Sequence, residues 1–381
     1  MVFNGVDTLG SDHKLLSGKR LGLITSVSGV DRQLESTLRI LYNRYKLVAL
    51  YSPEHGVRGD IEAGGMVDTY RDPHTGLPVF SLYRKDSKRL APEMVEGVDA
   101  IVYDIQDLGT RYYTFISTLL YAMEDCAVLG LPLIVLDRQN PLGGEVVEGN
   151  VLDPAYTSFI GAYPLPIRYG LTIGELATMV NQEKALGCDL HVVACQNWIR
   201  KMLFPHTGLL WMMPSLGIPR FETALLYPGM CLVEGTNLSE GRGTSCPFEM
   251  VGAPFIDSQI LSDAMNSRQL AGVRFTAVYF KPTASKHAGT LCGGVHAHVT
   301  DLSVFRPVQT GIVLLGTIRT LYSKEFQFLP AQEPGRRPFI EYLAGGDLLT
   351  SAIMDTQSII ARCERESLGF AQHKIQYHLY P

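Results

Sequence analysis

The first half of the chain alternates continuous apolar runs with helical segments, and this alternation constrains the fold more than any other feature. Strands buried on both faces of a parallel sheet read as unbroken apolar runs. The runs lie at residues 18–29, 46–51, 77–83, 98–104 and 131–137, with helical segments at 36–45 and 114–128. The pattern predicts a Rossmann-like doubly wound α/β domain in roughly the first 150 residues.

A further helix, strand and loop region follow this alternation. The helix at 172–186 opens with Thr172 and Glu175, the spacing of a capping box, which favours a capping role for Glu175 over a catalytic one. A strand is expected at 189–195. Residues 209–248 are so rich in proline and glycine that we expect a long loop region with short helices, and such regions are usually functional.

The last third of the chain has a different pattern, which indicates a smaller α+β domain. The strands expected here are half-exposed, because their apolar residues alternate with polar ones. The expected elements are helices at 258–270, 308–322, 347–354 and 356–366 and strands at 273–280 and 292–300. We expect two tightly packed domains, at 1–245 and 246–381.

Composition excludes several classes of protein. Hydrophobic residues make up 46% of the chain and charged residues 19%, which is typical of a folded globular protein. The net charge of −5 argues against a nucleic-acid partner, since phosphate contacts require a basic surface. No apolar run approaches the roughly 18 residues of a membrane-spanning helix, so no membrane segment is expected.

The N-terminal residues and the cysteines predict a cytoplasmic protein. Residues 1–7 have neither the basic nor the apolar region of a signal peptide, although a signal removed during export would leave no trace. The seven cysteines are scattered without a CxxC pair, which suits reduced thiols. Nothing in the sequence indicates an oligomeric state.

Neither a nucleotide cofactor nor a metal is expected. The turn after the first strand lacks both GxGxxG and the Lys-Ser/Thr of a phosphate-binding loop. His296 and His298 place two imidazoles on one face of a strand, but no cysteine or acid cluster is expected near them, and HExxH is absent.

Three of the predicted strands end in polar clusters. The clusters lie at residues 51–60, 103–113 and 137–144. The carboxyl ends of parallel strands share one edge of the sheet, so the carboxylates of these clusters could converge for acid–base or glycosyl-transfer chemistry. These carboxylates are Glu54, Asp104, Asp107 and Asp137. Alternatively, an aspartate at a strand end caps the next helix or pairs with an arginine, as Asp104 and Asp137 could.

A fourth polar cluster occupies the glycine-rich loop 234–244. Its hydroxyl, amide, carboxylate and guanidinium groups suit a polyhydroxylated, acidic ligand. Alternatively, the loop is structural, and its glutamates and arginine pair with each other. The ligand-binding candidates in it are Glu234, Asn237, Glu240 and Arg242.

Several long motifs, in fixed order over nearly the whole chain, resemble those of the bacterial exo-β-N-acetylmuramidases, a glycoside hydrolase family long labelled a domain of unknown function. The motifs are Ser52-Pro-Glu-His-Gly56, Asp104-Ile-Gln-Asp-Leu-Gly-Thr-Arg-Tyr-Tyr113, Asp137-Arg-Gln-Asn-Pro-Leu-Gly-Gly144, Pro164-Leu-Pro-Ile-Arg-Tyr-Gly170, Tyr227-Pro-Gly229 and Glu234-Gly-Thr-Asn-Leu-Ser-Glu-Gly-Arg-Gly-Thr244. One departure is Gln139, where the family motif usually has proline.

The resemblance implies removal of terminal β-1,4-linked N-acetylmuramic acid (MurNAc) from the non-reducing end of peptidoglycan fragments such as MurNAc-GlcNAc (GlcNAc, N-acetylglucosamine). It also implies a Rossmann-like domain and a site in the cleft between two domains. The partners are then peptidoglycan-derived disaccharides or muropeptides. The family's proposed catalytic glutamate corresponds to Glu54.

On this hypothesis Glu54 is a general acid that protonates the leaving oxygen. Asp107 or Glu240 would stabilise the oxocarbenium-like transition state or activate water, unless the substrate's own N-acetyl group is the nucleophile. The candidates for the carboxylate of the lactyl group are Arg111, Arg168 and Arg242. The remaining expected contacts are His55, Arg58, Asp104, Gln106, Tyr112, Asn140, Glu234 and Asn237. Two alternatives stay open, a muropeptide-binding protein without activity and a metal-dependent hydrolase.

Overall fold

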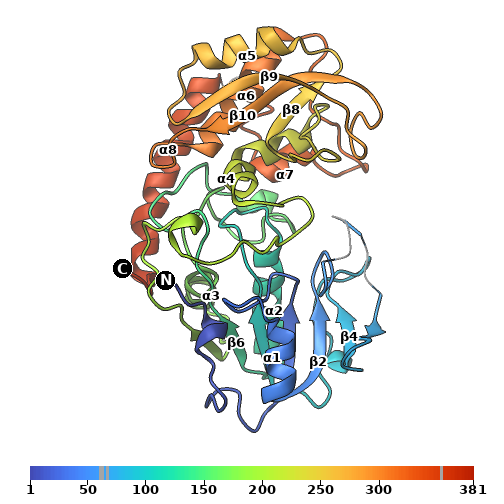
Figure 1. Cartoon of the computed structure of the whole chain (residues 1–381), viewed down its shortest axis with the longest axis vertical. Helices are drawn as coiled ribbons and strands as arrows, with labels where there is room; N and C mark the ends of the chain where they lie inside the picture. Colours follow the sequence, from blue (N-terminus) through green and yellow to red (C-terminus); the bar gives the residue numbers. More distant parts are fainter. Residues whose placement is uncertain (60–63, 66–67, 352–354) are drawn as a thin grey trace.

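The apolar runs of the first half form one mostly parallel sheet (Figure 1). The computed structural model describes residues 1–59, 64–65, 68–351 and 355–381. Within these residues the sheet has seven strands in the order β3-β4-β2-β1-β5-β6-β7, and only β3 is antiparallel to its neighbour. The strands are β1 (Arg20–Thr25), β2 (Lys46–Ser52), β3 (Tyr70–Arg71), β4 (Pro78–Ser81), β5 (Ala100–Asp104), β6 (Leu133–Leu136) and β7 (Leu190–Val193). The predicted fold class is confirmed; β3 was not predicted.

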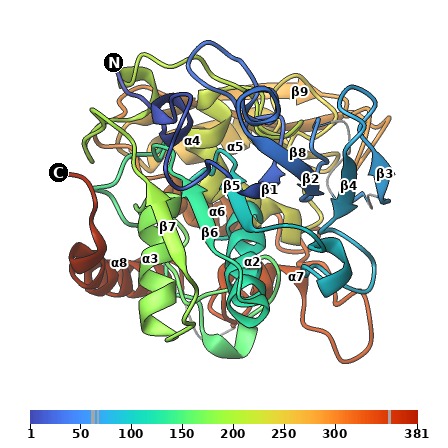
Figure 2. The ribbon, with the colours of Figure 1, turned by 90° about the horizontal axis from the view of Figure 1, so that it is seen from below.

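Helices cover both faces of this sheet, because successive residues of a strand point to opposite sides. In β5, Ala100 packs in a cluster with α1 (Thr37–Arg44), whereas Ile101 packs in the core that contains α2 (Phe115–Leu129) and α3 (Ile173–Glu183). Helices α2 and α3 lie side by side (Figure 2). The capping box predicted at the start of α3 is confirmed.

The order of the strands fixes where a ligand can bind. β1 is central, and the chain moves outward from it on one side through β2 and β4 and on the other through β5, β6 and β7. The connections after β1 and β5 therefore leave in opposite directions. In doubly wound sheets this reversal opens a crevice beyond the carboxyl ends of the strands, where ligands bind.

The last third of the chain forms a smaller antiparallel sheet with helices packed on it. Its strands pair in the order β8-β10-β9, and α4 lies between this sheet and the large one (Figure 1). The elements are α4 (Phe221–Met230), β8 (Met250–Ala253), α5 (Ser258–Ser267), β9 (Val273–Phe280), β10 (Cys292–Val299), α6 (Pro307–Leu321), α7 (Phe339–Ala344) and α8 (Thr356–His373). Both predicted strands are confirmed, whereas β8 and α7 were not predicted.

Two predictions for the C-terminal helices were wrong in extent. The helix expected at 347–354 is a turn over residues 347–351, and residues 352–354 lie outside the described part of the chain. The helix expected at 356–366 continues to His373 as α8. In Figure 1, α8 descends from the small sheet to the side of the large one, where both chain termini lie.

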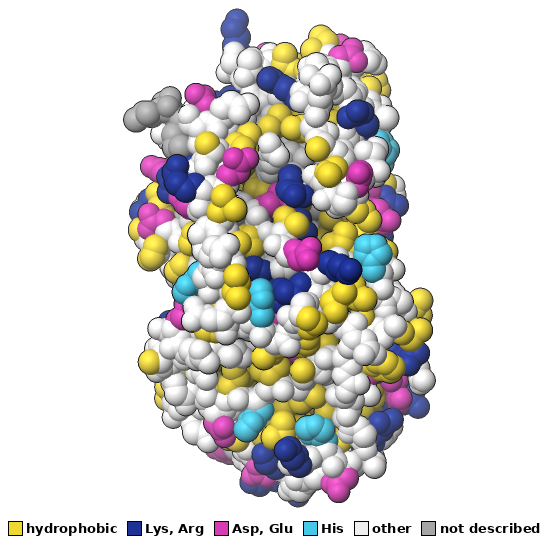
Figure 3. Space-filling view, turned by 90° about the vertical axis from the view of Figure 1, so that its left-hand side faces the viewer, with side chains coloured by type: hydrophobic (Ala, Val, Ile, Leu, Met, Phe, Trp, Pro, Cys, Tyr) yellow, Lys and Arg dark blue, Asp and Glu magenta, His cyan; other side chains and the backbone are white. Residues whose placement is uncertain are grey.

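Figure 3 shows the face that lies on the left in Figure 1. Charged and histidine side chains gather around a hollow near the middle of this face. One core cluster contains buried residues from α2, α4 and α6, so the two sheets share apolar packing. Among the described residues, no helix combines the length and the apolar character needed to cross a bilayer.

Candidate active site

Glu54 lies just beyond the carboxyl end of β2, in the loop that Pro53 opens by withholding a backbone donor from the ladder. Its side chain is held from two directions. Oε1 accepts a hydrogen bond of 2.8 Å from the backbone N–H of Gly64, and Oε2 accepts one of 2.6 Å from Oγ1 of Thr114, the residue that precedes α2. Glu54 is only 8% exposed, so its carboxyl group is fixed at the edge of the sheet.

The loop that carries Glu54 has an unusual backbone. His55 has φ of 73°, in the left-handed region that a non-glycine residue rarely occupies, and its ring packs edge-on against Phe115 at 6.2 Å between centroids. Such backbone strain clusters at functional sites. Asp60, which closes the first polar cluster of the sequence, lies outside the described residues.

Tyr83 and Lys88, which follow β4, form a wall beside Glu54 that the sequence analysis missed. Burial and the charge of Glu54 raise the pKa of Tyr83 to about 12, so its hydroxyl stays protonated next to the carboxyl group. Lys88 Nζ lies 3.5 Å from the centroid of the Tyr83 ring and 5.0 Å from that of Phe159. Their position in the sequence could have identified them, because they follow the end of a strand, as the three predicted polar clusters do.

A chain of aromatic rings connects this region to loop 234–244. Phe115 packs edge-on against Tyr113 at 5.0 Å, Tyr113 against Tyr227 at 5.9 Å, and Tyr227 against Phe248 at 4.9 Å. The guanidinium of Arg242 stands 4.8 Å from the centroid of Phe248. The first and fourth polar clusters of the sequence are therefore joined through one continuous aromatic layer.

Three predicted residues act on the same hydroxyl group, that of Tyr113. Burial raises the pKa of Tyr113, the charges of Asp107 and Glu54 raise it further, and the charge of Arg242 opposes them. The charges of Glu54, Asp107 and Arg242 therefore all bear on the Tyr113 hydroxyl.

Asp107 is the second carboxyl group of this neighbourhood, and it is buried. Its Oδ2 accepts hydrogen bonds from the backbone N–H of Gly109, at 2.6 Å, and from the hydroxyl of Tyr169. Its Oδ1 has no hydrogen-bond partner among the described residues. Burial raises the pKa of Asp107 to about 6, although the bond from Tyr169 opposes this shift. A carboxyl group that titrates near neutrality and keeps one oxygen unoccupied is suited to proton transfer.

Loop 234–244 lines a cavity of ≈ 490 Å³ together with Lys286. Glu240 is 1% exposed, and its Oε2 lies 3.0 Å from Lys286 Nζ. Arg242 Nη2 pairs with Glu234 Oε1 at 2.7 Å. Glutamate and arginine of the loop therefore pair with each other, as the structural alternative predicted, and still face a cavity. Asn237 instead faces away, bonding the backbone of residues 325 and 327.

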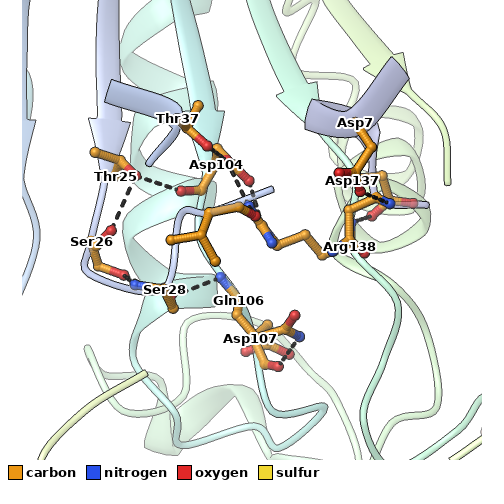
Figure 4. Close-up of polar contacts among 12 residues, drawn as sticks. Asp7, Thr25, Ser26, Ser28, Thr37, Asp104, Gln106, Asp107, Asp137 and Arg138 are labelled. Atoms are coloured by element: carbon orange, nitrogen blue, oxygen red, sulfur yellow. Dashed lines mark hydrogen bonds and ion pairs between the residues drawn. The ribbon is translucent and has the colours of Figure 1, made fainter. Parts of the chain in front are cut away.

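The other strand-end residues form a network of their own, which reaches the backbone of Asp107 through Gln106 (Figure 4). Asp104 is fully buried and pairs with Arg138, whose Nη2 donates to Oδ2 at 2.8 Å, while Thr37 donates to the same oxygen. Gln106 donates to the carbonyls of residues 107 and 139. Asp137 accepts from the backbone N–H of residue 174 at 2.8 Å and so caps α3. Asp104 and Asp137 thus have the structural contacts of the alternative prediction.

Other predicted ligand contacts are engaged within the fold. Arg111 donates to the carbonyls of residues 150, 165 and 343, and Arg168 pairs with Glu148 at 2.9 Å. Asn140 bonds the backbone of residues 142 and 171, and Tyr112 donates to the carbonyl of residue 228.

Arg58 pairs with Asp72 and lines a different cavity, of ≈ 530 Å³, beside α1. None of the described contacts of these five side chains (Arg58, Arg111, Tyr112, Asn140 and Arg168) involves Glu54 or Asp107.

One expectation about metal ligands was wrong. Folding brings Cys246 and Glu249 next to His296, and one ligand atom of each lies within 4.8 Å of the others. However, Arg220 donates to both oxygens of Glu249, at 2.9 and 2.5 Å, and to the Cys246 sulfur at 3.3 Å. A guanidinium already supplies the positive charge at this cluster, so the cluster does not favour a cation.

Known proteins of one family match the full length of the chain. Family models described as the N-terminal and C-terminal parts of exo-beta-N-acetylmuramidase NamZ match residues 21–222 and 225–380. The peptidoglycan beta-N-acetylmuramidase NamZ of Bacillus subtilis (strain 168) is 46% identical over 385 residues, which cover 100% of this chain and 91% of the relative.

Two crystal structures of DUF1343 family proteins from Bacteroides fragilis NCTC 9343 share the fold. They superpose with TM-scores of 0.91 and 0.78 at 36% and 30% identity, and in both cases 100% of this chain and 99% of the other are covered. The chain belongs to the exo-β-N-acetylmuramidase NamZ family.

Proposed function

We propose that this protein is an exo-acting glycoside hydrolase that releases terminal β-1,4-linked MurNAc from the non-reducing end of peptidoglycan fragments, with MurNAc-GlcNAc as the simplest substrate. The observation that carries the proposal is the full-length family match together with the place of Glu54. Glu54 is buried, held by two hydrogen bonds and located at the ligand-binding edge of a doubly wound sheet.

In the proposed mechanism Glu54 is the general acid. It transfers its proton to the glycosidic oxygen as the bond from that oxygen to C1 of MurNAc breaks, so the GlcNAc leaving group departs as an alcohol. Water then adds to C1, and the proton that it loses returns to a carboxylate of the site. Thr114 and Gly64 orient Glu54 throughout, because they bond both of its oxygens.

Asp107 is our proposal for the second carboxyl group. Its charge raises the pKa of Tyr113, as that of Glu54 does, and its Oδ1 has no hydrogen-bond partner among the described residues. In its ionised form it would stabilise the positive charge that develops at C1, or orient the substrate's N-acetyl group for attack on C1. Glu240 remains the alternative, although Lys286 and Ser285 already contact its oxygens.

Hydrolysis of 4-nitrophenyl β-N-acetylmuramide by the wild type and by Glu54→Gln tests the proposal. We expect turnover of the muramide and not of the matching glucosaminide, and a loss of at least about 10²-fold in kcat for the variant. Glu93→Gln is the matched control, since Glu93 is an exposed glutamate of the same domain. Binding of MurNAc without turnover by the wild type would instead support a muropeptide-binding protein, and loss of turnover with a chelator a metal-dependent hydrolase.

We also propose that the protein acts in the cytoplasm, on fragments taken up by the cell. All seven cysteines are free thiols, and reducing compartments maintain thiols. Fractionation of cells that express the tagged protein would check this location.

A further inference from the structure

The proposed substrate differs from GlcNAc by a lactyl ether on C3, and thus by one carboxylate. A carboxylate that leaves water for a protein site requires a charge-assisted partner. The arginines that the sequence suggested are already engaged. Arg111 bonds three carbonyls, Arg168 pairs with Glu148, and Arg242 lies between two glutamates. An anion that approached Arg242 would meet these two glutamates as well.

Lys88 has different surroundings. Its ammonium group lies over the faces of Tyr83 and Phe159, and no ion pair joins it to a carboxylate in the part of the chain that the structure describes. Cation–π contacts hold the group in place without neutralising its charge. Lys88 is half-buried, and burial lowers its pKa while the charge of Glu54 opposes this shift.

Lys88 is also close to the reacting end of the proposed substrate. Tyr83 lies between the two groups, since its ring carries the ammonium of Lys88 and its hydroxyl interacts with Glu54. In MurNAc the lactyl oxygen is on C3, two ring carbons from the C1 at which Glu54 would act. The rings of Tyr83 and Phe159, 5.6 Å apart, add an apolar surface beside the charge.

We propose that Lys88 binds the lactyl carboxylate of MurNAc and is thereby a residue that determines specificity for muramides over glucosaminides. The inference rests on the proposed function and identifies the residue that recognises the negative charge of the substrate. A bound carboxylate would give the partly desolvated ammonium group a hydrogen-bond acceptor, which the rings of Tyr83 and Phe159 do not supply. A neutral GlcNAc unit would leave this ammonium group without its partner.

The test compares two substrates, 4-nitrophenyl β-N-acetylmuramide and its lactyl methyl ester, which lacks the negative charge. For the wild type we expect kcat/KM to be about 10- to 100-fold higher with the acid than with the ester, the range of a hydrogen bond to a charged group. In Lys88→Met this preference should vanish, mainly through a higher KM for the acid. Lys88→Arg should keep the preference, because the charge remains.

Lys85→Met is the matched control, since Lys85 is an exposed lysine of the same loop, and it should retain the wild-type preference. Thermal unfolding of each variant checks that the fold persists. If Lys88→Met still prefers the acid, the assignment is wrong even though the enzyme is a muramidase. If the wild type cleaves neither substrate, the proposed function fails. Calorimetric binding of MurNAc to wild type and Lys88→Met then decides the role of Lys88 separately.

Discussion

Asp107 and Glu54 are both buried carboxyl groups, yet their surroundings differ. Both oxygens of Glu54 accept hydrogen bonds, whereas Oδ1 of Asp107 has no partner among the described residues. Burial therefore dominates at Asp107 and raises its pKa from 3.8 to about 6. Two carboxyl groups with different environments can take different roles in one site, one as acid and one as anion.

The raised pKa of Asp107 predicts a pH-dependent stability. In the native state the protonated form is favoured, so the stabilisation is fully present below the unfolded pKa near 4 and is lost as pH rises through about 6. Asp107→Asn cannot ionise. We expect the free energy of unfolding of the wild type, relative to this variant, to fall by on the order of 2–3 kcal/mol between pH 4 and pH 7.

Urea unfolding of both proteins over this pH range measures the difference. Burial raises the pKa of Asp137 to about 6 as well, but Asp137 is present in both proteins and cancels. Parallel curves for wild type and variant would show that Asp107 is not protonated preferentially in the native state.

From the sequence, individual candidate site residues could be predicted only where they belong to a recognisable motif. Of the four carboxylates that could converge, Glu54 and Asp107 both act on the Tyr113 hydroxyl, whereas Asp104 and Asp137 have structural partners. Lys88 was missed because a lysine in a polar loop has no pattern of its own. Only the packing against Tyr83 and Phe159 distinguishes it from the exposed Lys85.

At the scale of elements, one ion pair connects three strand ends. Arg138, which follows β6, donates to Asp104 at the end of β5 and to the carbonyl of Val30, which follows β1. Both partners are almost fully buried. Removing one partner of such a pair leaves a buried charge uncompensated.

We therefore expect Arg138→Met to lower the free energy of unfolding by roughly 3–5 kcal/mol in chemical denaturation. Asp104→Asn in the same chain should recover part of this loss, because the uncompensated charge is removed. Effects of the two substitutions that simply add, or a loss below about 1 kcal/mol for Arg138→Met, would show that the pair does not couple these strands.

Elements without a solvent-facing side were poorly defined by the sequence, which gave no bounds for α4 and missed β8. In α4 only Glu222 is exposed, so the helix lacks an amphipathic period, and Pro228 inside it reads as a break. Strand β8 is short and contains Gly252, which a strand pattern does not favour. The strands of the large sheet were predictable because burial on both faces leaves its own signature, the continuous apolar run.

At the scale of the whole molecule, the residues after α8 connect the small-sheet domain to the large sheet. The hydroxyl of Tyr380 donates to Asp137 at 2.5 Å and accepts from the backbone N–H of Cys195 at 2.9 Å. Lys374 Nζ donates to the carbonyls of residues 144 and 170 at 2.5 and 2.6 Å. Since α8 itself packs on α6, this tail restrains the two domains relative to each other.

Tryptophan fluorescence can report on this attachment. Trp198 is buried and packs edge-on against Tyr380 at 5.3 Å, and the chain has one other tryptophan, Trp211. In a Trp211→Phe background, removal of residues 374–381 should expose Trp198 to water, shift its emission to longer wavelength and lower the melting temperature. Tyr380→Phe keeps the ring and removes only the hydroxyl. We expect it to leave the emission unchanged and to cost about 1–3 kcal/mol, because Asp137 and the Cys195 N–H each lose a buried partner.

The two variants separate two functions of the tail, covering the core and bonding the strand ends. If the shortened chain kept the wild-type emission and melted in one transition at the wild-type temperature, the tail would contribute no restraint. If it melted in two transitions, the large sheet and the small-sheet domain would unfold independently once the tail is absent. We expect one transition at a lower temperature, since the hydrogen bonds of Tyr380 and Lys374 are lost while the apolar core that the two sheets share remains.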